Sequence, residues 1–251
     1  MGRLVQSLRK NANSSRLAFN YSSVYLTLHL TDFVKMEVHI LNKSQSIFNQ
    51  YIAELRDVNI QKDSLRFRRN LERIGEILGY EISKTLNYER KDVITPLGNA
   101  NEILLDEDIV LGTILRAGLP MHNGLLNYFD KAENAFISAY RKHEDDGTFK
   151  IRVEYFASPS LHDKVLILSD PMLASGKSMV LSYKAMLKNG TPKHTYLAVA
   201  IASQEGLDYA RAHLPKNTTM WIGAVDEELS SKSYIIPGLG DAGDLAFGEK
   251  L

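Results

Sequence analysis

Two stretches near the start of the chain repeat apolar residues at the three- and four-residue spacing of helices. The first begins near Ser44 and carries Ile47, Tyr51, Ile52 and Leu55. Asp63 has the chemistry of an N-cap for a second, longer helix. The apolar residues of that helix fall on one stripe, namely Phe67, Leu71, Ile74, Leu78, Ile82 and Leu86. Such a stripe faces a core, so the pattern predicts two N-terminal helices packed on the body of the protein.

After Pro96 the pattern changes to short apolar runs that alternate with helical segments. It predicts strands at residues 109–115, 135–140, 165–168, 196–201 and 220–225, and helices at 119–129, 177–188 and 205–213. The runs are apolar throughout, as in strands that are buried on both faces. This alternation predicts an α/β fold with a mainly parallel sheet flanked by helices.

One polar segment interrupts the alternation. Residues 143–147 (HEDDG) carry a turn signal at Asp146-Gly147. Alternating residues follow at Ile151, Val153 and Tyr155. The segment therefore predicts a β-hairpin arm that projects from the sheet.

The composition narrows the function classes. The 251 residues include 30 Lys plus Arg and 30 Asp plus Glu, and a general nucleic-acid binder would show a basic excess, so no nucleic-acid partner is expected. The chain has no cysteine, which excludes disulfides and thiolate catalysis and fits a cytoplasmic location. No apolar run approaches the ~20 residues that span a membrane, so no membrane partner is expected.

Residues 1–35 differ from the remainder because they are basic, rich in Ser and Asn, and contain Asp32 as the single acid. A transit peptide has this composition. Alternatively, Met36 is the native start and the preceding residues are extra translated sequence. We expect residues 1–35 to be an N-terminal extension, flexible or not native, and residues 36–251 to form a single domain.

The most informative segment is residues 165–180, VLILSDPMLASGKSMV. It combines a buried strand that ends in Asp170, a turn of small residues at 174–176, and the start of a helix. Ligands of open parallel sheets bind beyond the carboxyl ends of the strands. There, small residues let a phosphate reach the free amides of a helix N-terminus, Ser178 can add a hydroxyl donor, and Asp170 can accept hydrogen bonds from sugar hydroxyls.

Residues 165–180 also have two other interpretations, a Walker A motif and a structural connection without a ligand. Gly176-Lys177-Ser178 matches the end of a Walker A motif, but that motif requires glycine five residues before its final Gly, where this chain has Pro171. A P-loop is therefore rejected. An ordinary strand–turn–helix connection without a ligand stays open on these residues alone.

Three segments in the same order resemble uracil phosphoribosyltransferases. SDPMLASGKS is similar to the family's loop for phosphoribosyl pyrophosphate (PRPP), usually DPMLATGGS. Ile114–Gly118 (ILRAG) resembles the family's ILRAGLGM segment, and Tyr234–Gly248 (YIIPGLGDAGDLAFG) nearly repeats its C-terminal signature. The resemblance extends from about Met36 to the end. It implies a type I phosphoribosyltransferase fold and the conversion of uracil and PRPP to UMP and pyrophosphate in pyrimidine salvage.

The resemblance also implies roles for individual residues. Asp170, Arg116 and Asp241 would be the catalytic residues, and Arg116, Arg141 and Asp241 would contact PRPP. The rest of the PRPP site would be the loop Asp170, Pro171, Met172, Leu173, Ala174, Ser175, Gly176, Lys177 and Ser178. Uracil would be wrapped by Ile235, Gly240, Asp241 and Ala242.

The family's other properties complete the expectation. Mg²⁺ is expected with a pyrophosphate substrate, and because the sequence has no dense carboxylate cage, the metal would arrive bound to PRPP rather than occupy a protein metal site. The family implies a homo-oligomer and makes GTP a candidate effector. The alternative is a phosphoribosyltransferase-fold regulatory protein that binds RNA, which would require a basic face.

A few residues depart from the family pattern. Lys177 stands where the uracil enzymes usually have Gly or Asn, and Pro120, His122 and Asn123 replace the usual residues after the LRAG motif. Lys177 is compatible with binding, since related purine enzymes have a TGKT loop. His122, His143 and His194 lack metal-ligand spacing and are expected to be structural or surface residues.

Overall fold

The structure is a computed structural model that describes residues 36–143 and 149–250. The predicted N-terminal extension at residues 1–35 lies outside the described residues, as does the turn of the predicted arm. No helix in these ranges is long and apolar enough to cross a membrane.

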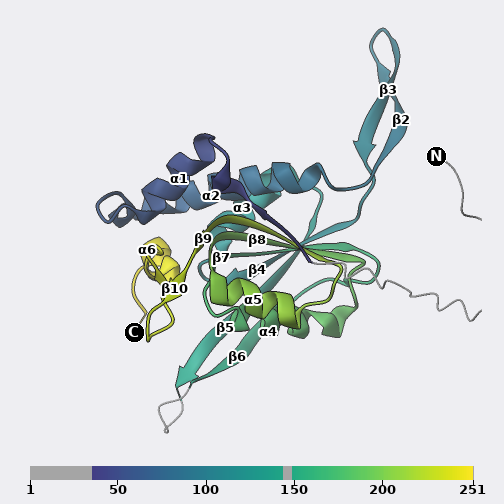
Figure 1. Cartoon of the computed structure of the whole chain (residues 1–251). Helices are drawn as coiled ribbons and strands as arrows, with labels where there is room; N and C mark the ends of the chain where they lie inside the picture. The colour runs from purple at the N-terminus through teal and green to yellow at the C-terminus, as the bar shows by residue number, and fades with distance from the viewer. Residues whose placement is uncertain (1–35, 144–148, 251) are drawn as a thin grey trace, which may run out of the picture. The chain divides into compact units, whose positions relative to one another are not determined.

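Within the described residues, the core is one seven-stranded sheet with the order β1-β9-β8-β7-β4-β5-β6 (Figure 1). Neighbouring strands are parallel except for the antiparallel pair β5–β6. The predicted fold class is thereby confirmed. The strands are β1 (Glu37–Ile40), β4 (Ile109–Leu115), β5 (Glu133–His143), β6 (Phe149–Ala157), β7 (Val165–Leu173), β8 (His194–Ser203) and β9 (Thr218–Asp226).

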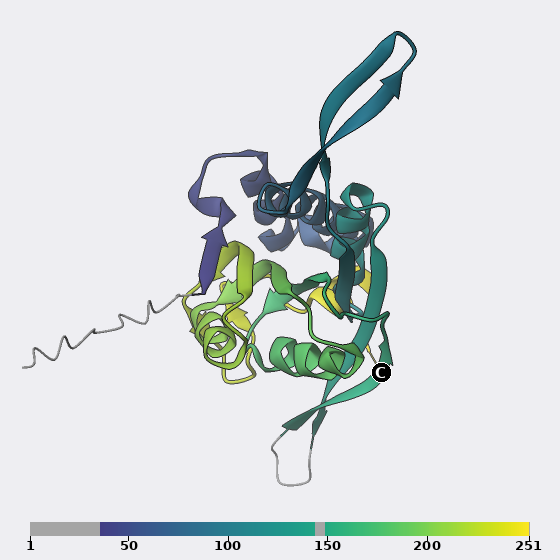
Figure 2. The same ribbon diagram turned by 90° about the vertical axis from the view of Figure 1, so that its right-hand side faces the viewer.

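Helices cover both faces of this sheet, as Figures 1 and 2 show. One face carries α1 (Ile47–Arg56), α2 (Ser64–Ser83) and α3 (Leu119–Tyr128), and the other carries α4 (Lys177–Met186) and α5 (Gln204–His213). Along β7, Ile167 packs with the first group, whereas Leu166 and Leu168 pack with the second. Burial on both faces explains why the strands are apolar at consecutive positions.

The two predicted N-terminal helices are confirmed. The Asp63 side chain accepts hydrogen bonds from the Leu65 and Arg66 amides at 3.0 and 3.1 Å, as an N-cap does. Every member of the predicted apolar stripe is buried, although Leu86 lies beyond the end of α2. The helix predicted to reach residue 188 ends at Met186 and continues as a 3₁₀ turn, Leu187–Asn189.

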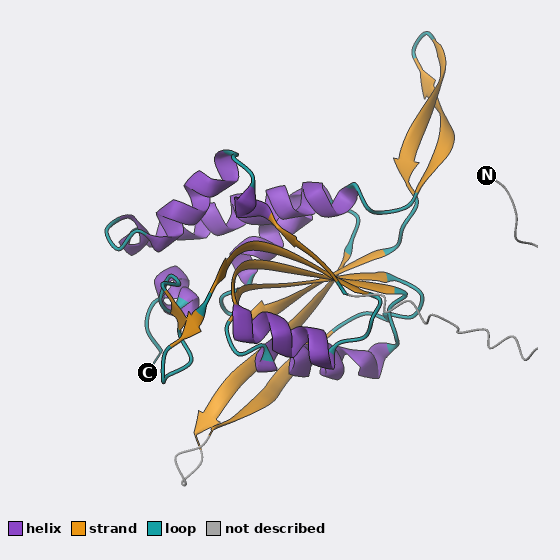
Figure 3. Cartoon of the chain, in the orientation of Figure 1, coloured by secondary structure: helices purple, strands orange, loops and turns teal. Residues whose placement is uncertain are grey.

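Several elements were not predicted. They are the edge strand β1, the hairpin of β2 (Tyr88–Thr95) and β3 (Gly98–Leu105), the strand pair β10 (Glu228–Leu229) and β11 (Ile235–Ile236), and the short helix α6 (Ala242–Phe247). The β2–β3 hairpin, which connects α2 to β4, projects away from the sheet and its helices (Figure 3). The predicted arm is present as β5–β6, which is longer than the pattern indicated.

Candidate active site

The sheet has a switch point between β4 and β7. These strands are neighbours, yet the chain leaves β4 toward β5 on one side, and β7 is followed by β8 and β9 on the other. Ligands of open α/β sheets bind in the crevice at the carboxyl ends of such a strand pair. The residues that follow β4 and β7 are Arg116 and the segment up to Ser178, so the topology brings two of the sequence motifs to one place.

Strand β7 is longer than predicted, which changes the position of Asp170. The polar residues from Ser169 indicated the strand end, but the chain continues to pair with β8 through Asp170–Val199, Met172–Ile201 and Leu173–Ala202. Pairing with β4 stops at Ser169. Asp170 therefore lies inside the strand, beside the open edge on the β4 side.

Burial perturbs the Asp170 carboxyl group. The residue is only partly exposed, and this burial raises the pKa of Asp170 to about 7, against a smaller opposing effect from a hydrogen bond that the Met172 amide donates at 3.3 Å. A carboxyl group held near neutrality in a cleft is a feature of functional sites. A ligand that donates hydrogen bonds would favour its ionised form.

The predicted phosphate loop, residues 170–178, packs against the start of α5. Gly176 caps α4 with a φ of +73°, and a Cβ there would lie 2.7 Å from the Gly206 carbonyl oxygen. The Ser203 hydroxyl donates to the Ala174 carbonyl at 2.6 Å and accepts from the Gly206 amide at 2.8 Å. Only glycine fits at 176, and the loop is fixed by backbone contacts.

Arg116 lies in the turn between β4 and α3 and is exposed. Its Nη2 donates to Asp244 Oδ1 and to the Gly248 carbonyl, both at 3.2 Å. A Cβ on Gly118 would lie 2.2 Å from Thr113 Oγ1, so the turn that carries Arg116 requires glycine. The guanidinium therefore contacts the C-terminal segment of the chain through two hydrogen bonds.

Asp241 caps α6 by accepting a hydrogen bond from the Asp244 amide at 3.0 Å. Lys250 Nζ lies 3.5 Å from its Oδ2. A Cβ placed on Gly243 would lie 3.2 Å from Asp241 Oδ1 and 4.0 Å from Arg116 Nη2, so both side chains border the same backbone. The structure therefore brings these two predicted catalytic residues together.

The three motifs also share one hydrophobic cluster. Ala117 from the LRAG turn, Met172 and Ala174 from the phosphate loop, and Ile235 and Ala242 from the C-terminal segment all pack in it. Ile235 and Ala242 are each 3% exposed. Their side chains are part of the core, which leaves main-chain groups to face a ligand.

An ion pair that sequence reasoning missed supports the C-terminal turn. Arg56 forms two hydrogen bonds of 2.8 Å with Asp226 and one of 3.0 Å with the Gly238 carbonyl. Asp226 also accepts from the Gly238 amide at 2.9 Å. The pair spans 170 residues in the sequence, and no local pattern reveals it.

Arg141 lies in β5, paired with Ile151 of β6, and its side chain is outside the described part of the structure. Its predicted contact with pyrophosphate stays a prediction. Among the described residues, no group of three or more His, Asp or Glu side chains is placed to hold a metal ion.

Comparison with known proteins decides the family. A family model described as uracil phosphoribosyltransferase matches residues 42–249. The chain belongs to the uracil phosphoribosyltransferase family. A relative from Porphyromonas gingivalis with that name is 57% identical over 216 residues, which are 86% of this chain and 100% of the relative.

A more distant relative and a solved structure are also similar to this chain, the first of them a uracil phosphoribosyltransferase. The one from Methanothermobacter thermautotrophicus is 40% identical over 188 residues, covering 74% of this chain and 85% of the relative. Among solved structures, a protein from Aquifex aeolicus has 33% identity and a TM-score of 0.76, covering 84% of this chain and 98% of its own.

Two of the residues that depart from the usual uracil phosphoribosyltransferase pattern, Pro120 and His122, take structural positions, whereas Asn123 and Lys177 are exposed. Pro120 is in the first turn of α3, where proline is tolerated. His122 is 2% exposed, and its Nε2 lies 2.8 Å from Asn134 Oδ1. Burial lowers the pKa of His122, as expected for a neutral packing residue.

Replacing Lys177 by the glycine usual in uracil phosphoribosyltransferases should keep activity and change the KM for PRPP by about threefold or less. Lys177 is expected to add charge near the PRPP phosphates, but it is exposed, so water screens that charge. Initial rates of Lys177→Gly at varied PRPP check this. Lys184→Gln, which removes a charge in the last turn of the same helix, is the control. Complete loss of turnover in Lys177→Gly would reveal a catalytic role for this lysine.

Proposed function

We infer that this chain transfers the ribose phosphate of PRPP to uracil and releases UMP and pyrophosphate. The observation that carries the inference is the convergence of the phosphate loop, the Arg116 turn and the C-terminal signature on one cluster at the β4–β7 switch point. The direct test is formation of UMP from uracil, PRPP and Mg²⁺ by the purified protein. Absence of UMP would overturn the assignment.

The proposed reaction develops positive charge at the anomeric carbon as pyrophosphate leaves and uracil N1 attacks. Such a transfer needs positioning and charge stabilisation more than covalent help. The amides of residues 174–178 at the start of α4 would hold the 5′-phosphate. Asp170, beside the loop, would accept hydrogen bonds from the ribose hydroxyls.

Arg116 would bind the pyrophosphate, since a guanidinium can form paired hydrogen bonds with phosphate oxygens. In the structure it contacts Asp244 and the Gly248 carbonyl instead. Its side chain is 43% exposed, so this pair is weak and the guanidinium can turn to a ligand. Pyrophosphate would replace the two acceptors with a more highly charged partner.

We propose that Mg²⁺ is carried to the site by the substrate. Mg²⁺ is commonly held by one or two carboxylates together with phosphate oxygens. Asp170 and Asp241 are the carboxylates that the family motifs place at this site. Bound in this way, the metal would neutralise charge on the departing pyrophosphate.

We propose that the protein is a homo-oligomer that uses the β2–β3 hairpin as a contact arm. The hairpin extends from the body in both Figures 1 and 2. Ile94 and Leu97 at its tip are 86% and 101% exposed. An isolated two-stranded ribbon is marginally stable in water, and exposed apolar clusters mark interaction surfaces.

Ile94→Asp should weaken self-association by about tenfold or more, since it would place a charge in an apolar interface. Light scattering across a dilution series measures the mass. Ile47→Asp, which changes an isoleucine that is 61% exposed at the start of α1, is the control. If the mass of Ile94→Asp is the same as that of the wild type, the hairpin does not mediate self-association.

Three further proposals concern a GTP effector, the cellular location and the RNA-binding alternative, and none of them is tied to particular residues. Activation by GTP stays a proposal that rests on the family alone. We also propose that the enzyme acts in the cytosol, which suits its cysteine-free sequence. The regulatory alternative would require salt-sensitive RNA binding without turnover, which a filter-binding assay beside the UMP assay would reveal.

A further inference from the structure

The turn that carries the uracil-binding backbone is held by one ion pair. Arg56 is the last residue of α1, and Asp226 is the last residue of β9. Arg56 donates to the Gly238 carbonyl, and Asp226 accepts from the Gly238 amide. The pair therefore holds the peptide groups on both sides of the Gly238 Cα.

The surroundings make this contact consequential. The Asp226 side chain is 8% exposed and the Arg56 side chain 23% exposed, so water screens the pair poorly. Removing one member of a buried pair leaves the other charge without a partner. The pair thus forms a rigid attachment for the turn rather than a solvated surface contact.

Packing alone supports one side of the turn poorly. A cavity of about 390 Å³ lies between residues 237–240 and the α1–α2 connection, and it is lined by Arg56, Val58, Gln61 and Lys62 together with Pro237, Gly238, Leu239, Gly240 and Leu245. On its other side the turn is packed, because Leu239 is 3% exposed and lies in the hydrophobic cluster. On the side of the cavity, the hydrogen bonds from Arg56 and Asp226 hold the Gly238 peptide groups.

The position of the turn determines where the proposed base-binding groups lie. Gly238 has a φ of +56°, and a Cβ there would lie 2.1 Å from the Ile235 carbonyl oxygen. Gly238 is thus in close contact with the backbone of Ile235, and it precedes Gly240 by two residues. A displacement of Gly238 would move main-chain groups at both positions.

We propose that Arg56 and Asp226 are positioning residues for uracil: they hold the Gly238 turn where its backbone can recognise the base. This inference rests on the proposed function. It assigns the pair to recognition of the base rather than to PRPP or to general stability. Its effect should therefore appear in the KM for uracil and in base selectivity.

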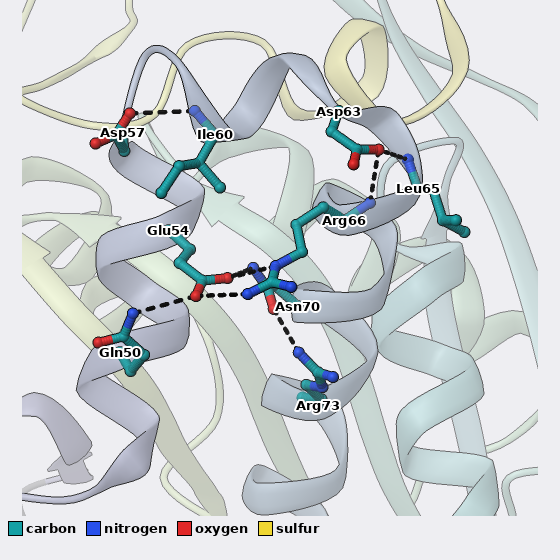
Figure 4. Close-up of polar contacts among 9 residues, drawn as sticks. All are labelled: Gln50, Glu54, Asp57, Ile60, Asp63, Leu65, Arg66, Asn70 and Arg73. Carbon is teal, nitrogen blue, oxygen red and sulfur yellow. Dashed lines mark hydrogen bonds and ion pairs between the residues drawn. The ribbon is translucent and has the colours of Figure 1, made fainter.

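A second ion pair provides a matched control (Figure 4). Glu54, also in α1, accepts two hydrogen bonds of 2.8 Å from Arg66 of α2, and its side chain is 8% exposed. It accepts a third from Asn70 at 2.7 Å. These contacts join α1 to α2, so this pair resembles Arg56–Asp226 in chemistry and in the burial of its carboxylate but differs in what it holds. The Arg66 side chain is the more exposed of the two arginines, at 48% against 23% for Arg56.

The experiment compares Arg56→Lys with Arg66→Lys. Lysine keeps the charge, but it cannot bridge both Asp226 oxygens and the Gly238 carbonyl as the planar guanidinium does. Arg56→Lys should raise the KM for uracil about tenfold or more, and lower the preference for uracil over cytosine, while the KM for PRPP stays within about twofold. Arg66→Lys should lower Tm and leave both KM values near those of the wild type.

Asp226→Asn is the second variant, because it keeps the shape of the side chain and should shift the KM for uracil in the same direction even if Arg56→Lys folds poorly. An unchanged KM for uracil in these folded variants would overturn the positioning role. Equal rises in Arg56→Lys and Arg66→Lys would also overturn it, since the effect would then be general. A wild-type protein that makes no UMP would instead overturn the proposed function, and the inference with it.

Discussion

Asp170→Asn should fold normally and lower kcat/KM for PRPP by ~10² or more, the size of effect seen when a transition-state contact is lost. Asparagine has nearly the same shape as aspartate, but one of its two oxygens becomes an NH₂ donor. The side chain then loses its negative charge and can no longer accept a hydrogen bond from a ribose hydroxyl on each of its two terminal atoms. Steady-state rates at varied PRPP, with unfolding curves on the same preparations, measure both parts of the expectation.

The pH dependence provides a second readout of Asp170. With its pKa near 7 in the free protein, the carboxyl group should lose its charge as the pH falls through 7, and kcat/KM for PRPP should fall with it. Asp170→Asn should lack this limb of the profile. An identical pH profile in the variant, or wild-type kcat/KM, would remove Asp170 from the site.

Stability should change in the opposite direction to activity. The folded pKa of Asp170 is raised above the unfolded value, so the unfolded chain binds fewer protons between about pH 4 and 7 and stability falls as pH rises through that range. Neutral Asn avoids this cost. The Tm of Asp170→Asn at pH 8 should therefore equal or exceed that of the wild type. Asp163→Asn, an exposed residue before β7, is the control for the substitution itself.

The elements predicted correctly are those in which burial leaves a periodic pattern. The stripe from Phe67 to Ile82 is buried, as is the run Ile109–Leu115 except for the half-buried Leu115, and both were placed closely by pattern alone. The β2–β3 hairpin carries no such pattern because nearly every residue in it is exposed. Because neither face of this hairpin is buried, its sequence has no alternation of apolar and polar residues from which the strands could be predicted.

The end of β7 was misplaced for a different reason. Ser169, Asp170 and Pro171 are residues that usually end strands, and Pro171 lacks an amide hydrogen to donate. The strand continues because β8 pairs with its other residues and the opposite edge is left open beside the β4 turn. Residues 170–173 are paired with β8 on one side and unpaired on the other, which leaves room for a ligand. Because these residues include polar ones and a proline, local sequence preferences predict a loop here instead of a strand.

Some residues of the candidate site could be predicted from the sequence and others could not. Arg116, the phosphate loop and Asp241 lie in contiguous motifs, so their resemblance to a family was visible in the sequence. Arg56 and Asp226 are separated by 170 residues and each is an ordinary charge at the end of an element. Their importance becomes visible only when folding brings both to the Gly238 peptide groups.

Base selection is where the backbone geometry has its largest expected consequence. Ile235 and Ala242 bury their side chains in the core, and Gly240 has no side chain and a φ of +92°. Main-chain groups are therefore the ones available to contact the edge of a base. We propose that a backbone N–H meets uracil O4 and that a backbone C=O meets the proton on uracil N3.

Cytosine reverses both of these groups, since an amino group replaces O4 and its N3 accepts a hydrogen bond. Each mismatch in a closed site should cost about 1–3 kcal/mol. Together they predict a preference for uracil of roughly 30-fold to over 10⁴-fold, at 1.4 kcal/mol per decade. Purines should be excluded by size as well. Measuring kcat/KM for uracil, cytosine, hypoxanthine and adenine at the same PRPP and Mg²⁺ concentrations tests this. If cytosine or a purine reacts as well as uracil, recognition by the backbone and the choice of substrate are both wrong.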